Sequence, residues 1–112
     1  MAEPTSWLLK DGVVLASLEI ARTRSARRKG LLGRDGFGAA LLLPRCRSIH
    51  TVGMRFTIDA AFCDGSGTVL RIVTVPPGRL ARPHLTARQV VEADGGAFER
   101  WGVTVGDELT FE

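Results

Sequence analysis

The chain has 112 residues, of which 45% are hydrophobic and 24% are charged, and it carries a formal net charge of +3. These values are typical of one soluble globular domain covering residues 1–112. No apolar run approaches the roughly 20 residues that span a bilayer, and the N-terminal residues lack the pattern of a secretory signal. We therefore expect a cytoplasmic protein with no membrane partner. Its two cysteines, Cys46 and Cys63, are too few for a disulfide framework, so we expect both to be free.

The spacing of apolar and turn-forming residues predicts several short elements in chain order. They are a hairpin at 7–10 and 13–21, a helix at 23–33, strands at 39–44, 47–52, 57–64, 68–75 and 87–94, a helix at 95–102 and a last strand within 103–112. The Asp11-Gly12 pair is a strong signal for a two-residue hairpin turn. Thr23 can cap the N-terminus of the first helix, and Gly33 can end it.

Two segments in the middle of the chain shape the expected sheet. Residues 47–52 and 57–64 predict an internal strand pair that bends at Gly53-Met54. Residues 68–75 are apolar on both faces, which predicts a central strand. Short strands separated by turns at this spacing favour a mainly β fold, a small β-sandwich or barrel-like domain with two short helices. The sequence gives no indication of an oligomeric state.

Charge is unevenly distributed along the chain. Residues 22–55 carry nine basic side chains and one acidic one, a net charge of +8, whereas residues 56–112 sum to −3. We expect a contiguous basic face that attracts anions, and the alternative is a solvated basic face without a partner. Nucleic acid is a disfavoured partner, because single-strand binders interleave aromatics with cations and Phe37 is the one aromatic in this segment.

Several blocks of sequence resemble one family, the domain of unknown function 192 family of small bacterial and archaeal proteins. The blocks are "GLLGR" at 30–34, "CRSIHTVGMRFTIDAAF" at 46–62, "DGSGTVLRI" at 64–72, Glu92 with Gly96, and "GVTVGDEL" at 102–109. The resemblance covers about residues 13–111. It implies a compact, mainly β fold of sandwich type, and it implies no activity.

The longest of these blocks contains the candidate site residues His50, Arg55 and Asp59. Asp59 could orient His50 or form a strong ion pair with Arg55. We expect these three residues to cluster at one end of the sheet. The leading interpretation is a non-enzymatic binding or accessory module for a small anionic or carbohydrate-like ligand. The alternative is a small hydrolase or lyase that uses His50 with Asp59.

Two further arrangements of reactive residues are less favoured. Cys46 and His50 are four residues apart, so on a strand they would share a face and could form a nucleophilic pair. A zinc site would need Cys46, His50, Cys63 and His84 together, but no closely spaced ligand pair is present to nucleate it. We therefore expect no metal and no cofactor.

Overall fold

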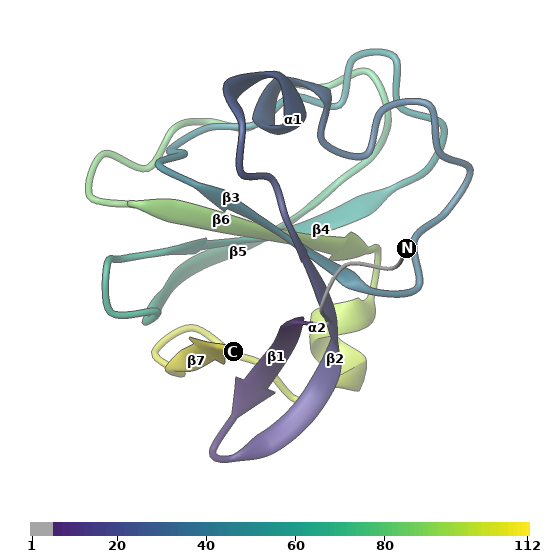
Figure 1. Ribbon diagram of the computed structural model, residues 1–112. Helices are drawn as coiled ribbons and strands as arrows, with labels where there is room; N and C mark the ends of the chain where they lie inside the picture. The colour runs from purple at the N-terminus through teal and green to yellow at the C-terminus, as the bar shows by residue number, and fades with distance from the viewer. Residues whose placement is uncertain (1–5) are drawn as a thin grey trace.

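The computed structural model describes residues 6–112, which form seven strands and two short helices (Figure 1). The elements are β1 (Ser6–Lys10), β2 (Val13–Ile20), α1 (Arg24–Lys29), β3 (Ala40–Pro44), β4 (Ile58–Cys63), β5 (Val69–Val75), β6 (Gln89–Asp94), α2 (Ala97–Arg100) and β7 (Leu109–Phe111). The prediction of a mainly β fold with two short helices is confirmed.

All seven strands belong to one sheet, in the order β5-β4-β6-β3-β2-β1-β7. Every neighbouring pair is antiparallel except β2 and β3, which are parallel. Parallel neighbours need a crossover connection, and here the crossover from β2 to β3 contains α1. This connection places α1 over one face of the sheet, while α2 lies on the other side of the sheet (Figure 1).

The sheet curls until its two ends meet. Beyond β5 and β7, which end the strand order, Thr68 and Glu108 form an isolated bridge. Nearby, the Leu109 N–H donates to the Gly67 carbonyl at 2.9 Å. Of the two architectures that the sequence predicts, the fold is therefore the barrel-like one.

The two faces of the curled sheet have separate hydrophobic cores. Along β6, Val91 and Ala93 belong to the core that packs against Phe98 of α2. Val90 belongs to the other core, which includes Leu31 after α1 and Met54 from the segment between β3 and β4. Alternate residues of a strand point to opposite faces, so β6 supplies side chains to both cores.

The structure corrects three of the predicted elements. Residues 47–52 form no strand, and their contact with the rest of the fold includes a single bridge between His50 and Leu80. β5 is an edge strand, whereas β4 is buried along its whole length between β5 and β6. The first helix has Thr23 as its N-cap, as predicted, but it ends at Lys29 because Gly30 leaves the helical conformation, with a positive φ of 51°.

Candidate ligand-binding site

A cavity of about 310 Å³ lies between α1, the segment at residues 45–54, and β6. Its apolar lining is shared with the core beneath α1. Its polar lining consists of five cationic side chains, one carboxyl group, one thiol, one hydroxyl and one imidazole, from Arg24, Arg27, Arg28, Lys29, Arg45, Glu92, Cys46, Ser48 and His50.

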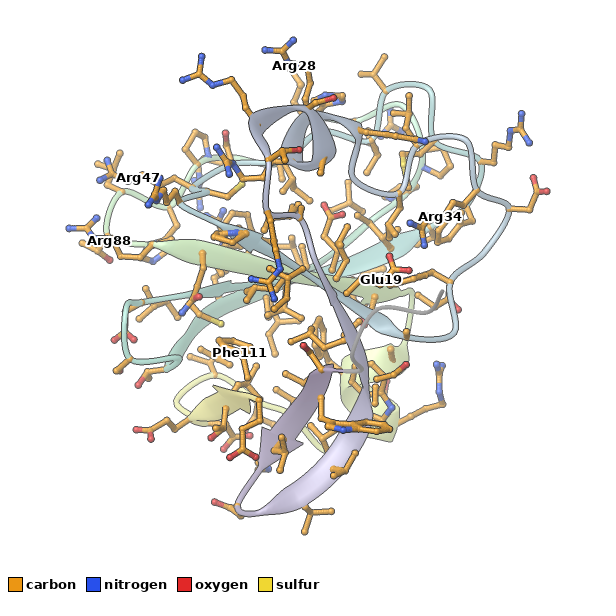
Figure 2. All side chains as sticks on the ribbon, in the orientation of Figure 1. Glu19, Arg28, Arg34, Arg47, Arg88 and Phe111 are labelled. Carbon is orange, nitrogen blue, oxygen red and sulfur yellow. The ribbon has the colours of Figure 1, made fainter. Side chains whose placement is uncertain are left out.

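Cationic side chains reach the cavity from two directions. α1 contributes a run of them in its last turn, Arg27, Arg28 and Lys29, where the helix dipole favours positive charge. Arg28 points away from the body of the molecule at the α1 end (Figure 2). Arg45 follows Pro44 of β3 with a positive φ of 57°, a backbone conformation that is unusual for a residue other than glycine. Within residues 6–112, none of the cavity cations takes part in an ion pair.

Glu92 is the one acidic residue of the cavity lining. It lies opposite Leu41 of β3 and Ala60 of β4, and it is only 5% exposed. Its carboxyl lies beneath Gly30, where an added Cβ would be 3.5 Å from Glu92 Oε1. No hydrogen bond to this carboxyl forms among the described residues 6–112. Burial raises the pKa of Glu92 to about 7, because the ionised form loses its hydration. Near neutral pH the group can therefore hold or release a proton.

The segment at residues 46–50 supplies the remaining polar groups. The Cys46 thiol donates to the Ser48 carbonyl at 3.0 Å, and burial raises its pKa above the usual range. The thiol form therefore dominates near neutral pH, which does not favour a nucleophilic role. His50 is exposed at the cavity lining.

Asp59 does not join this group. It is buried, and its carboxylate accepts hydrogen bonds from the Thr74 hydroxyl at 2.7 Å and from the Gly96 N–H at 3.0 Å. It also accepts a longer bond, of 3.4 Å, from the Phe98 N–H at the start of α2. Asp59 thus serves the α2 side of the sheet, whereas His50 lines the cavity beside α1.

Arg55 is also separate from the cavity lining. It forms an exposed ion pair with Asp35, with 3.1 Å between Nη1 and Oδ1. The predicted Arg55–Asp59 and His50–Asp59 pairs are therefore not formed. They were inferred from a strand pair that folds back at Gly53-Met54, and residues 47–52 form no such strand.

The two cysteines are free, as predicted. Cys63 is buried in the core on the α2 side, and burial raises its pKa to about 12. Cys46 belongs to the opposite face of the sheet. In residues 6–112, no three His, Cys, Asp or Glu side chains are arranged to hold a metal ion.

The predicted basic face is only partly assembled in one place. Five of the nine basic residues in the segment at 22–55 line the cavity. Two others lie in ion pairs elsewhere, Arg34 with Glu19 and Arg55 with Asp35.

Glu92 is an important residue of the cavity to which no sequence motif assigned a role. Its signal in the sequence is a single acidic residue between apolar neighbours in "QVVEAD". On the face that it shares with Val90, a buried carboxyl is unexpected, because unpaired acids are rarely buried.

Comparison with known proteins identifies the family. The family DUF192, described as "Uncharacterized ACR, COG1430", matches residues 8–111. The chain belongs to this family. A curated relative, the UPF0127 protein PF1050 of Pyrococcus furiosus, is 34% identical over 62 residues, which are 55% of this chain and 53% of that relative. The chain thus covers about half the length of that relative.

Two solved structures have the same fold. One is a protein of unknown function from Novosphingobium aromaticivorans DSM 12444, with a TM-score of 0.77 and 20% identity over 95% of this chain and 83% of the other. The second, described as a candidate transcription regulator from Sinorhizobium meliloti 1021, has a TM-score of 0.77 and 21% identity over 96% of this chain and 92% of the other. At this identity the likeness shows a shared fold alone. No helix among residues 6–112 is long and apolar enough to cross a membrane.

Proposed function

We propose that this DUF192 protein is a non-enzymatic module that binds a small anionic ligand in the cavity beneath α1. One observation carries the proposal. Five cationic residues line a single cavity whose lining holds one acidic residue, Glu92, and none of these cations is paired with an acid within residues 6–112. Such an arrangement attracts anions and leaves the guanidinium groups free to bind a carboxylate or phosphate.

The position of Glu92 suggests which polar group the ligand carries besides its anionic group. A buried carboxyl without a protein hydrogen-bond partner is stabilised by a ligand group that hydrogen-bonds to it. A hydroxyl fits best, since it can donate to the ionised carboxylate and accept from the protonated carboxyl. A cavity of about 310 Å³ is at the small end of ligand sites. The ligand therefore needs an anionic group, a hydroxyl group and a small size. An acidic or phosphorylated sugar has all three.

Binding is favoured over catalysis for two reasons. The His50–Asp59 pair of the hydrolase or lyase interpretation is not formed, since both oxygens of Asp59 bind other groups. Cys46 donates its thiol proton to a backbone carbonyl and has a raised pKa, so a thiolate nucleophile is disfavoured.

The test is a ligand panel measured by thermal shift and calorimetry. The panel contains a hexose phosphate, the parent hexose, a tricarboxylate and inorganic phosphate. We expect the hexose phosphate to raise the melting temperature, because a ligand at 100 times its Kd stabilises the native state by about 2.7 kcal/mol. The uncharged hexose should have no effect.

Arg45→Gly separates binding from folding. Glycine accepts the positive φ at this position, so the change should leave stability unchanged or slightly higher. It should also weaken binding at least tenfold. Arg100→Ala is the matched control, because Arg100 is an exposed arginine on α2. If Arg45→Gly and Arg100→Ala bind equally well, or if no anion in the panel binds, the cavity is not an anion site.

A further inference from the structure

Two loops beside the cavity are joined by hydrogen bonds, residues 45–56 before β4 and residues 76–88 between β5 and β6 (Figure 1). The Thr51 N–H donates to the Arg79 carbonyl at 2.8 Å, and the His84 N–H donates to the Arg47 carbonyl at 3.0 Å. The buried Thr51 hydroxyl also donates to the Pro76 carbonyl at 2.6 Å. These bonds fix the backbone of both segments, here called the paired loops.

The paired loops expose large aliphatic side chains. Leu80 is 81% exposed, Leu85 is 80% exposed, and Val52 is 56% exposed. Single exposed leucines are common on protein surfaces. Here, however, the two most exposed large hydrophobic residues described share one loop, and that loop is held by hydrogen bonds to its neighbour.

The same surface is strongly cationic. The paired loops contain no aspartate or glutamate and six arginines, Arg45, Arg47, Arg55, Arg79, Arg82 and Arg88. Figure 2 shows Arg47 and Arg88 extending into solvent at the same edge of the molecule, and the Cys46 N–H next to Arg47 donates to the Arg88 carbonyl. Arg55 alone among the six is in an ion pair within residues 6–112.

We propose that the paired loops dock on an anionic lipid surface, with Leu80 and Leu85 inserted at the headgroup boundary and the arginines against the phosphates. Exposed aliphatic residues flanked by cations are the features that hold peripheral proteins on such membranes. Nucleic acid fits less well, because base stacking needs exposed aromatics and the one aromatic in the paired loops, Phe56, is half-buried. A protein partner fits less well too, since the leucines protrude and most binding hot spots are aromatic or arginine anchors in pockets.

This proposal departs from the expectation of no membrane partner. That expectation rests on the lack of a long apolar run and of a secretory signal pattern, and neither bears on a folded surface. The two leucines are separate from the cavity, since neither Leu80 nor Leu85 is part of its lining, whereas Arg45 belongs to both the cavity and the paired loops.

The experiment is co-sedimentation of the full chain with vesicles of phosphatidylcholine containing 30% phosphatidylglycerol. We expect binding at low salt, none to pure phosphatidylcholine, and loss of binding in 0.5 M salt. Leu80→Ser/Leu85→Ser should weaken partitioning by more than tenfold without lowering the melting temperature, because both side chains are exposed. The matched control is Val13→Ser/Val14→Ser, two exposed residues of the β1–β2 hairpin, and it should bind as the parent protein does.

Three outcomes would overturn the proposal. The first is absence of binding to the anionic vesicles. The second is equal binding by the two serine double variants, which would leave charge as the sole cause. The third is an oligonucleotide that binds the paired loops while the vesicles do not, which would assign the surface to nucleic acid. Melting curves of each variant show whether it is folded, so that a loss of binding is not mistaken for a loss of structure.

Discussion

Glu92 occupies a position on β6 where its neighbours across the sheet are Leu41 and Ala60. An apolar residue there would complete the core beneath α1 and would stabilise it. A buried carboxyl without a partner instead costs free energy, and stability sacrificed at one residue is common where function requires a particular group. The sequence marks Glu92 only as an acid in an apolar strand. Its place in the cavity depends on the crossover through α1, which no local pattern predicts.

Stability should depend on pH through Glu92. In the unfolded chain its pKa is the ordinary 4.5, and in the fold burial raises it to about 7. The folded state therefore binds more protons between these values, so the stability present below pH 4.5 is lost as pH rises through about 7. The loss should be about 3 kcal/mol.

Glu92→Gln should remove this loss. We expect the variant to match the parent protein near pH 4 and to be more stable than it at pH 8, as measured by urea denaturation at each pH. Glu19→Gln is the control, because Glu19 is exposed. Parallel pH profiles for the parent and Glu92→Gln would show that Glu92 is not the titrating group.

At the scale of single elements, Asp59 links β4 to α2. Asp59 accepts hydrogen bonds from the Thr74 hydroxyl and from the backbone of Gly96 and Phe98. Asp59→Ala should therefore leave buried donors unpaired and destabilise the protein by about 3 kcal/mol. Asp35→Ala should cost less than about 0.5 kcal/mol, because its ion pair with Arg55 is exposed. Chemical denaturation of both variants checks the contrast, and equal costs would contradict the structural role of Asp59.

The turn between β4 and β5 has no room for a side chain at Gly67. A Cβ there would lie 2.2 Å from the Leu109 carbonyl oxygen, and φ is +90°. Gly67→Ala should cost about 3 kcal/mol or more, since backbone must move. Gly12 has a similar φ of +76° but nothing within 4 Å, so Gly12→Ala should cost only about 1 kcal/mol. If the two variants melt together, backbone conformation alone explains the cost.

Local patterns predicted some elements well and others poorly. The hairpin formed as expected because the Asp11-Gly12 turn and the two apolar runs agree. Residues 47–52 look like a strand in the sequence, yet they lie outside the sheet, because β3 and β6 pair with each other and leave no free edge beside them. The burial of β4 likewise follows from the strand order, which no single segment encodes.

At the scale of the whole molecule, the C-terminal strand closes the curled sheet. Leu109 of β7 is 2% exposed and packs in the core on the α2 side. Leu109→Ala should therefore cost about 3 kcal/mol. Val105 is 61% exposed, so Val105→Ala should cost less than about 0.5 kcal/mol. Thermal denaturation compares the two, and a small effect at Leu109 would mean that its side chain contributes little to the core on the α2 side.

The pairing of β1 with β7 also sets an order of events during synthesis. β1 pairs with β2 on one edge and with β7 on the other, and Trp7 and Glu112 exchange backbone hydrogen bonds of 2.6 and 3.0 Å. On the ribosome, β1 and β2 can pair as soon as both have emerged. The other edge of β1 must wait until Phe111 leaves the exit tunnel. Until then Leu8 and the open edge of β1 are exposed, and an unpaired strand edge is a template for pairing with another chain.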